Sequence, residues 1–170
     1  MGIWEDVYLR AQGPIALRHA YVESDLDVPD LEQARLRVSA WLTNMTDEPV
    51  SGAFQARMEE IEVAGEVALD AGETKEVVLR PQEHAELVIE QPRVWWPHPV
   101  GPQELYDAEV SVAVDGAVSD REAVRFGIRR IHTYLNDEHW RTYEVNGRKI
   151  LIRGGAWMTN DMLLRLTERR

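Results

Sequence analysis

The sequence predicts an all-β protein with an immunoglobulin-like β-sandwich at its centre. Residues 31–43 and residues 105–115 alternate apolar and polar side chains almost without interruption. Alternation of this kind is typical of strands that bury one face and expose the other. About seven such strands, separated by turn sequences, favour a sandwich of two sheets. The likeness to immunoglobulins is architectural only, because the chain has no cysteine.

The two strongest patterns also predict which side chains enter the core. In the first, the inward residues are Ala34, Leu36, Val38, Ala40 and Leu42, and the outward ones are Arg35, Arg37, Ser39 and Thr43. In the second, the inward residues are Tyr106, Ala108, Val110, Val112 and Val114, and the outward ones are Asp107, Glu109, Ser111 and Asp115. Weaker strand patterns occupy residues 15–22, 53–58, 77–79, 87–89 and 124–128.

The two ends of the chain fit a sandwich less well. Residues 1–12 form a strand-like run that stops at Gly13-Pro14, and residues 130–153 predict further strands around Asn146-Gly147. Asn-Gly and Asp-Gly pairs between strand patterns indicate tight hairpins, so we expect one there and one at Asp115-Gly116. Residues 162–170 have the composition to start a helix, for which Asp161 is a possible N-cap.

Composition lowers the expectation of several classes of function. The formal net charge of −11 disfavours nucleic-acid partners and anionic membrane surfaces. No apolar run approaches the length of a membrane span, and the first residues lack the features of a signal peptide. The five histidines show no metal-ligand spacing. We therefore expect no metal and no cofactor.

Residues 94–101 contain the most unusual loop, in which Trp95 and Trp96 are adjacent. Neighbouring side chains in an extended segment point in opposite directions, so the two rings should contact different surfaces. We expect them to pack against the core or another domain, because tryptophan mostly supplies buried area. Stacking on a sugar ring is the alternative.

Residues 149–161 resemble the first strand of a catalytic barrel, because a short apolar run leads into Gly154-Gly155, Trp157 and Asp161. One strand cannot close a barrel, so the catalytic chemistry is expected to lie outside this chain. No catalytic residue is therefore assigned within it. For Asp161, ligand binding and helix capping remain open.

Four stretches together resemble family 2 glycoside hydrolases, in the branch of β-mannosidases and exo-β-glucosaminidases. Residues 2–9 resemble the last strand of the N-terminal jelly-roll domain, and Trp95-Trp96-Pro97 resembles a tryptophan-rich loop of the sandwich. Phe126-Gly127-Ile128-Arg129 is similar to the family's exit from the sandwich. Residues 146–149 and 152–155 are similar to the segment that leads into the barrel.

The resemblance implies a division into residues 1–12 from a sugar-binding jelly-roll, residues 13–130 as the sandwich, and residues 131–170 as a linker hairpin with the first barrel strand. It also implies that Trp157 and Asp161 line the sugar pocket. The sequence spacing between these two residues is closer to the pattern of β-mannosidases than to that of glucosaminidases. In this family two glutamates on later barrel strands carry out a retaining hydrolysis of terminal β-glycosides, and neither is present here. The implied partners are the jelly-roll, the barrel and the carbohydrate substrate. A free-standing module that binds sugar or protein is the alternative.

Overall fold

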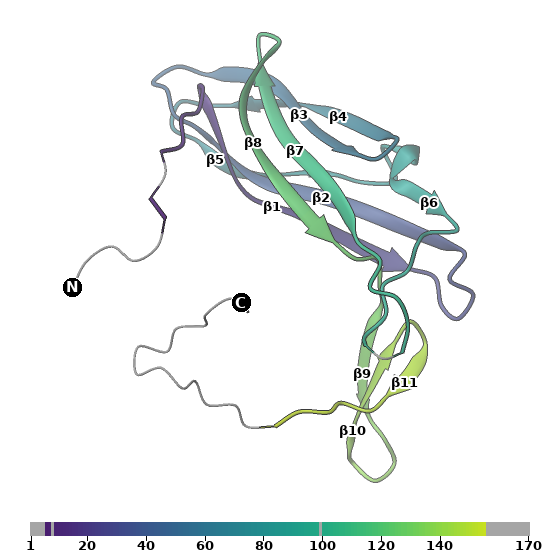
Figure 1. The fold of residues 1–170 in the computed structure, drawn as a ribbon. Helices are drawn as coiled ribbons and strands as arrows, with labels where there is room; N and C mark the ends of the chain where they lie inside the picture. The colour runs from purple at the N-terminus through teal and green to yellow at the C-terminus, as the bar shows by residue number, and fades with distance from the viewer. Residues whose placement is uncertain (1–5, 8, 99, 156–170) are drawn as a thin grey trace, which may run out of the picture.

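The computed structural model describes residues 6–7, 9–98 and 100–155, which form a β-sandwich and a smaller sheet beside it (Figure 1). One sheet of the sandwich has the order β1 (Ile15–Leu26), β2 (Gln33–Asn44) and β5 (Thr74–Leu79), and β6 (Val88–Glu90) also pairs with β2. The other has the order β4 (Ile61–Leu69), β3 (Val50–Met58), β7 (Tyr106–Val114) and β8 (Ala117–Phe126). All these pairs are antiparallel, which confirms the predicted fold class.

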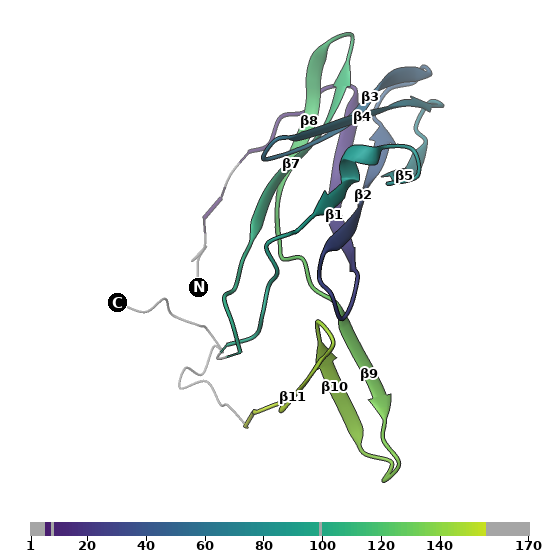
Figure 2. The same cartoon turned by 90° about the vertical axis from the view of Figure 1, so that its right-hand side faces the viewer.

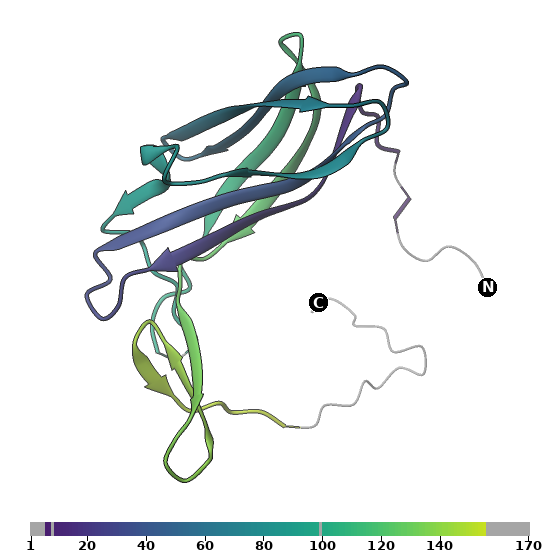
Figure 3. The same cartoon turned by 180° about the vertical axis from the view of Figure 1, so that it is seen from behind.

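The smaller sheet has the order β11 (Arg148–Ile150), β10 (Arg141–Val145) and β9 (Ile131–Leu135). It extends from one end of the sandwich, as the turned view shows (Figure 2). The described N-terminal residues join the opposite end, which is clearest from behind (Figure 3). A short 3-10 helix, η1 (Ala85–Leu87), precedes β6.

The predicted core is largely confirmed. All five inward residues of the first pattern are buried, and so are the first four of the second, whereas Val114 is half-buried near the end of β7. Two outward predictions are wrong: Ser39 is 5% exposed and Ser111 is 8% exposed. Ser39 lies between Tyr21 and Val78 on the neighbouring strands, and their larger side chains shield the short hydroxyl.

The sequence prediction omitted strand β4. β3 and β4 pair from Met58↔Ile61 onward across the two-residue turn Glu59-Glu60, which contains none of the usual turn residues. Glu59 nevertheless adopts a positive φ of 48°. The predicted hairpins at Asp115-Gly116 and Asn146-Gly147 are confirmed, with φ values of 51° and 79°, and of 51° and 75°.

The ends differ from expectation. No strand is formed by residues 6–7 and 9–12, so the strand-like run predicted there is not seen in the described part of residues 1–12. Residues 151–155 continue from β11 without strand pairing. Trp157, Asp161 and the predicted helix at residues 162–170 lie outside the described residues. Among the described residues, no helix has the length and hydropathy to cross a membrane.

Candidate functional site

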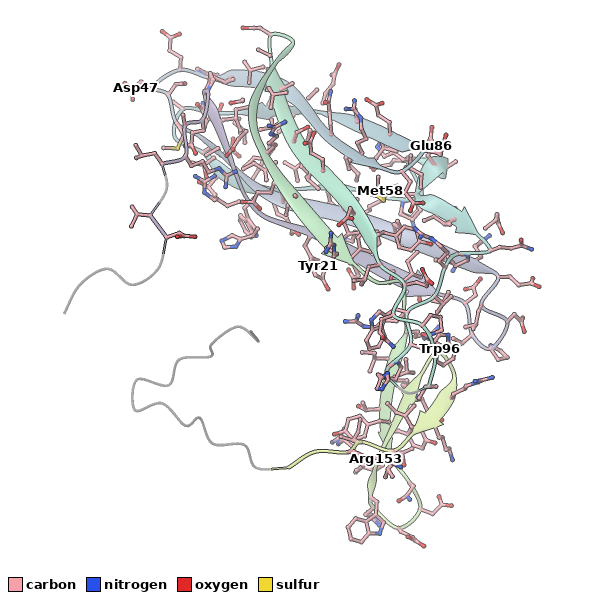
Figure 4. All side chains as sticks on the ribbon, viewed as in Figure 1. Tyr21, Asp47, Met58, Glu86, Trp96 and Arg153 are labelled. Atoms are coloured by element: carbon pink, nitrogen blue, oxygen red, sulfur yellow. The ribbon has the colours of Figure 1, made fainter. Side chains whose placement is uncertain are left out.

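Three of the sequence motifs meet where the sandwich joins the smaller sheet, close to Trp96 in Figure 4. Val94 forms a parallel bridge with Ile128, which brings the tryptophan loop beside the exit from β8. The turn between β10 and β11 supplies Asn146, which contacts both segments. We name this region the tryptophan junction and define it as residues 94–97, 127–130 and 146–148.

Trp95 faces the exit from the sandwich. Its backbone N–H donates to the carbonyl of Ile128 at 2.9 Å. A Cβ atom on Gly127 would lie 2.9 Å from the Trp95 Cβ, so only glycine allows this approach. The guanidinium of Arg129 lies 4.6 Å from the centroid of the indole ring, which is a cation–π distance.

Trp96 repeats this arrangement on the other side of the loop. A Cβ atom on Gly101 would lie 2.9 Å from its ring atoms, and the Arg148 guanidinium lies 5.2 Å from the ring centroid. Both tryptophans are half-buried. The structure therefore supports the packing interpretation, because each ring contacts a glycine and an arginine of this chain.

Asn146 connects the segments of the junction. Its side chain is buried at 2% exposure, accepts from the Arg130 N–H at 2.9 Å, and donates to the Trp95 carbonyl at 2.9 Å. Its own N–H donates to the Arg130 carbonyl at 2.8 Å. Asparagine tolerates the left-handed turn conformation and also carries both a donor and an acceptor, so one residue forms the hairpin and holds it to the sandwich.

Replacing Asn146 with alanine should loosen the smaller sheet. The change removes the two side-chain bonds and should cost about 1–3 kcal/mol of unfolding free energy. Hydrogen exchange of β9–β11 should become faster. Asp115→Ala is the matched control, because Asp115 has the same φ of 51° but forms no side-chain hydrogen bond within the described residues. Equal losses in both variants would show that turn strain alone explains the effect.

The two faces of the smaller sheet carry different side chains. On one face, the Tyr134 hydroxyl donates to Glu144 at 3.1 Å, and His132 lies 3.6 Å from the same carboxylate. On the other face, Ile131 and Leu135 are more than half exposed, and Thr133 between them accepts from Arg141 at 3.3 Å. Leu151 and Ile152, which come after β11, are also more than half exposed. Large apolar side chains that are exposed in this number are typical of interaction surfaces.

A second site missed by the sequence analysis lies at the opposite end of the sandwich, around Asp120 of β8. Its side chain is 4% exposed. One carboxylate oxygen accepts from the Leu17 N–H and from Arg18, both at 2.8 Å. The other oxygen accepts from the Arg121 N–H at 2.9 Å and from Arg10 at 2.6 Å. An aspartate in a strand gives no sequence signal that separates it from solvent-facing carboxylates.

Neighbouring side chains of β8 bond the free edge of β1 in the same way. The Ser119 hydroxyl accepts from the Ile15 N–H at 2.9 Å, and Glu122 accepts from the Ala20 N–H at 3.0 Å. With Asp120, these side chains accept hydrogen bonds from backbone N–H groups on the edge of β1 that faces away from β2, which no described strand pairs. The two sheets are therefore joined along this edge by side-chain bonds.

Burial acts to raise the pKa of Asp120, but hydrogen bonds from the Leu17 N–H, Arg10, the Arg121 N–H and Arg18 outweigh it. The net result is a pKa below the usual value for aspartate. Asp120 is thus a charged structural group and not a proton donor at neutral pH.

No group of three or more histidine, aspartate or glutamate side chains in the described residues could hold a metal ion. The predicted substrate-binding residues, Trp157 and Asp161, lie outside the described region. The structure instead shows two joints, which are regions where other segments attach to the sandwich. One is the tryptophan junction, and the other, at the opposite end, is the cluster around Asp120.

Comparisons with known proteins identify relatives that match nearly the whole chain. A profile described as Glycosyl hydrolases family 2 matches residues 15–129. An exo-β-D-glucosaminidase of Streptomyces avermitilis is 41% identical over 163 residues, which cover 96% of this chain and 18% of the relative. A mannosylglycoprotein endo-β-mannosidase of Lilium longiflorum is 30% identical over 184 residues, covering 99% of this chain and 18% of the relative.

Solved structures agree. The crystal structure of the exo-chitosanase of Amycolatopsis orientalis superposes with a TM-score of 0.83 at 34% identity, covering 98% of this chain and 19% of that protein. A β-D-mannosidase from Dictyoglomus thermophilum, at 18% identity and a TM-score of 0.66, shares the fold. The chain spans less than a fifth of each of these relatives.

Proposed function

Because the chain belongs to family 2 of the glycosyl hydrolases, we propose that it is the sandwich that orients a catalytic barrel in a longer enzyme. The resemblance to the branch of β-mannosidases and exo-β-glucosaminidases is confirmed by the relatives. The chain matches a non-catalytic domain of these enzymes.

The tryptophan junction is the observation that carries this proposal. Asn146 and the two tryptophans fix the smaller sheet to the sandwich through hydrogen bonds and packing. The exposed apolar side chains of Ile131, Leu135, Leu151 and Ile152 have the character of residues that another domain covers. In this proposal residues 13–130 form the sandwich, residues 131–170 form the linker hairpin and first barrel strand, and residues 1–12 end a preceding jelly-roll.

For the substrate, we propose a terminal β-D-glucosaminide rather than a β-mannoside. Relatives from Streptomyces avermitilis and Amycolatopsis orientalis at 41% and 36% identity are both named exo-β-D-glucosaminidase. This choice departs from the mannosidase-like spacing of Trp157 and Asp161. In either case the two residues would contact the sugar, with the indole stacking on its apolar face and the carboxylate accepting from hydroxyl groups.

A chimera tests the structural role. The chain replaces the matching segment of the Amycolatopsis orientalis enzyme, a variant of which was crystallised with PNP-β-D-glucosamine. The chimera should hydrolyse that nitrophenyl glycoside, while the 170-residue chain alone should not. Turnover by the isolated chain would contradict the proposal. So would micromolar binding of oligoglucosamine by the isolated chain, because it would favour a free-standing sugar-binding module.

In the same chimera, Asp161→Ala should lower kcat/KM about tenfold or more, because a hydrogen bond from a sugar hydroxyl to a charged group contributes about 1.5–3 kcal/mol. Its melting temperature should stay unchanged. Helix capping predicts the opposite pattern, which is a stability loss of about 1 kcal/mol with normal kinetics. Measuring both quantities on one preparation separates the two roles. A stability loss without a kinetic defect would remove Asp161 from the sugar pocket.

A further inference from the structure

Arg10 inserts a guanidinium group into the side-chain cluster that joins β1 to β8. Its Nη2 donates to Asp120 at 2.6 Å and to the Arg121 carbonyl at 2.8 Å, and it lies 3.4 Å from the Leu17 carbonyl. Its Nε donates to Asp120 at 3.1 Å, and its Nη1 donates to Glu122 at 3.2 Å. All three nitrogens of one guanidinium group are thus bonded to acceptors of the sandwich.

The acceptors are held in place by bonds that do not involve Arg10. The Leu17 and Arg121 N–H groups and Arg18 also donate to the Asp120 carboxylate. The backbone of β1 also fixes Glu122, through the Ala20 N–H at 3.0 Å. The geometry of the acceptors is therefore built by β1 and β8, both of which belong to the folded sandwich.

The segment that carries Arg10 has no secondary structure to hold it. Residues 9–13 form neither a strand nor a helix. Besides Arg10, their described bonds are those from Arg18 to the Gln12 side chain at 2.7 Å and from the Gly13 N–H to the Ser119 carbonyl at 2.7 Å. The Arg10 guanidinium therefore forms most of the described hydrogen bonds between this segment and the sandwich.

We propose that Asp120, Glu122 and the carbonyls of Leu17 and Arg121 form a guanidinium-binding site, which Arg10 occupies in cis. The site docks the segment that leads into the sandwich. Planar, forked donors match carboxylate acceptors in a way that an ammonium group cannot, so the site should select guanidinium over ammonium. If the proposed function also holds, this site fixes the sandwich relative to the domain that precedes it.

Chemical rescue tests the site in the 170-residue chain itself. Arg10→Ala should lower the melting temperature by about 5 °C and speed hydrogen exchange of the Gly13 N–H, which bonds the Ser119 carbonyl. Methylguanidinium at about 20 mM, well below denaturing concentrations, should restore much of that loss by mass action. Methylammonium at the same concentration should not restore it. The variant Arg10→Lys should melt at a lower temperature than wild type, because lysine has no guanidinium group.

Arg125→Ala is the matched control, because Arg125 forms a comparable bond of 2.6 Å with Asp107, but on the exposed surface. It should lose little stability and gain nothing from methylguanidinium. Adding Asp120→Asn to Arg10→Ala should abolish the rescue, measured as the shift in melting temperature. An unchanged melting temperature in Arg10→Ala would overturn the proposal. An equal effect of methylguanidinium on all variants would do so too, and neither result bears on the proposed role of the tryptophan junction.

Discussion

Replacing Leu36 with aspartate should unfold the sandwich. Leu36 has no exposed surface and lies on β2, whose inner face contributes to the single core between the two sheets. A buried, unpaired charge costs several kcal/mol, which approaches the total stability of about 5–15 kcal/mol that is typical of a domain. Circular dichroism and thermal melting should show no cooperative transition. Val112→Asp on β7, which also has no exposed surface, should behave in the same way.

The neighbouring Arg37 supplies the control, because it points to the outer face of β2 and pairs with Glu76 at 2.9 Å and Glu23 at 3.6 Å. Arg37→Gln should change stability by less than about 1 kcal/mol. Aspartate is a poorer control there than glutamine, because it would lie beside two carboxylates. If Arg37→Gln unfolded the protein and Leu36→Asp did not, the assignment of inner and outer faces would be reversed.

The alternation of the sequence predicted β2 and β7 because each strand has one buried face and one solvent-exposed face, and polar residues occupy the exposed face. β4 has the same alternation, with Ile61, Val63, Val67 and Leu69 on one face. It was missed because the turn before it is Glu59-Glu60, so that no glycine, asparagine or proline separates it from β3. The alternation alone would have predicted β4, whereas the requirement for a typical turn sequence before it led to its omission.

The two joints were predictable to different degrees. The motifs of the tryptophan junction were identified in the sequence. They do not predict that Asn146 bonds the Trp95 carbonyl or that Gly127 accommodates an indole. Such contacts depend on the relative placement of segments far apart in the chain. Asp120 gave no signal at all, because its burial results from β8 lying against the edge of β1.

These joints explain why a non-catalytic sandwich would matter to a glycosidase. Hydrogen bonds to the sandwich hold both the segment that enters it, through Arg10, and the sheet that leaves it, through Asn146. In the proposed arrangement, a sandwich held at both ends would position the barrel relative to a preceding domain. The accuracy of a barrel's placement would then depend on residues that contact no substrate.

Asp120→Asn should destabilise the protein by about 2–4 kcal/mol at neutral pH, because breaking a buried ion pair leaves its partners without compensation. The amide also replaces an acceptor oxygen with a donor, which repels the Leu17 N–H or the arginines. The loss should depend on pH. The folded pKa of Asp120 lies below the unfolded value of 3.8, so its contribution to stability is complete above that value and is lost as pH falls through the folded pKa.

The stability difference between wild type and Asp120→Asn should therefore be largest at neutral pH and shrink on acidification below about pH 4. Chemical denaturation at a series of pH values measures it. Asp107→Asn is the matched control: Arg125 lowers the pKa of Asp107 through its side-chain hydrogen bond, but the carboxylate is 74% exposed, so little change is expected. A difference that stays constant from about pH 7 to about pH 3 would mean that the variant acts through packing, and that the charge on Asp120 does not hold the two sheets together.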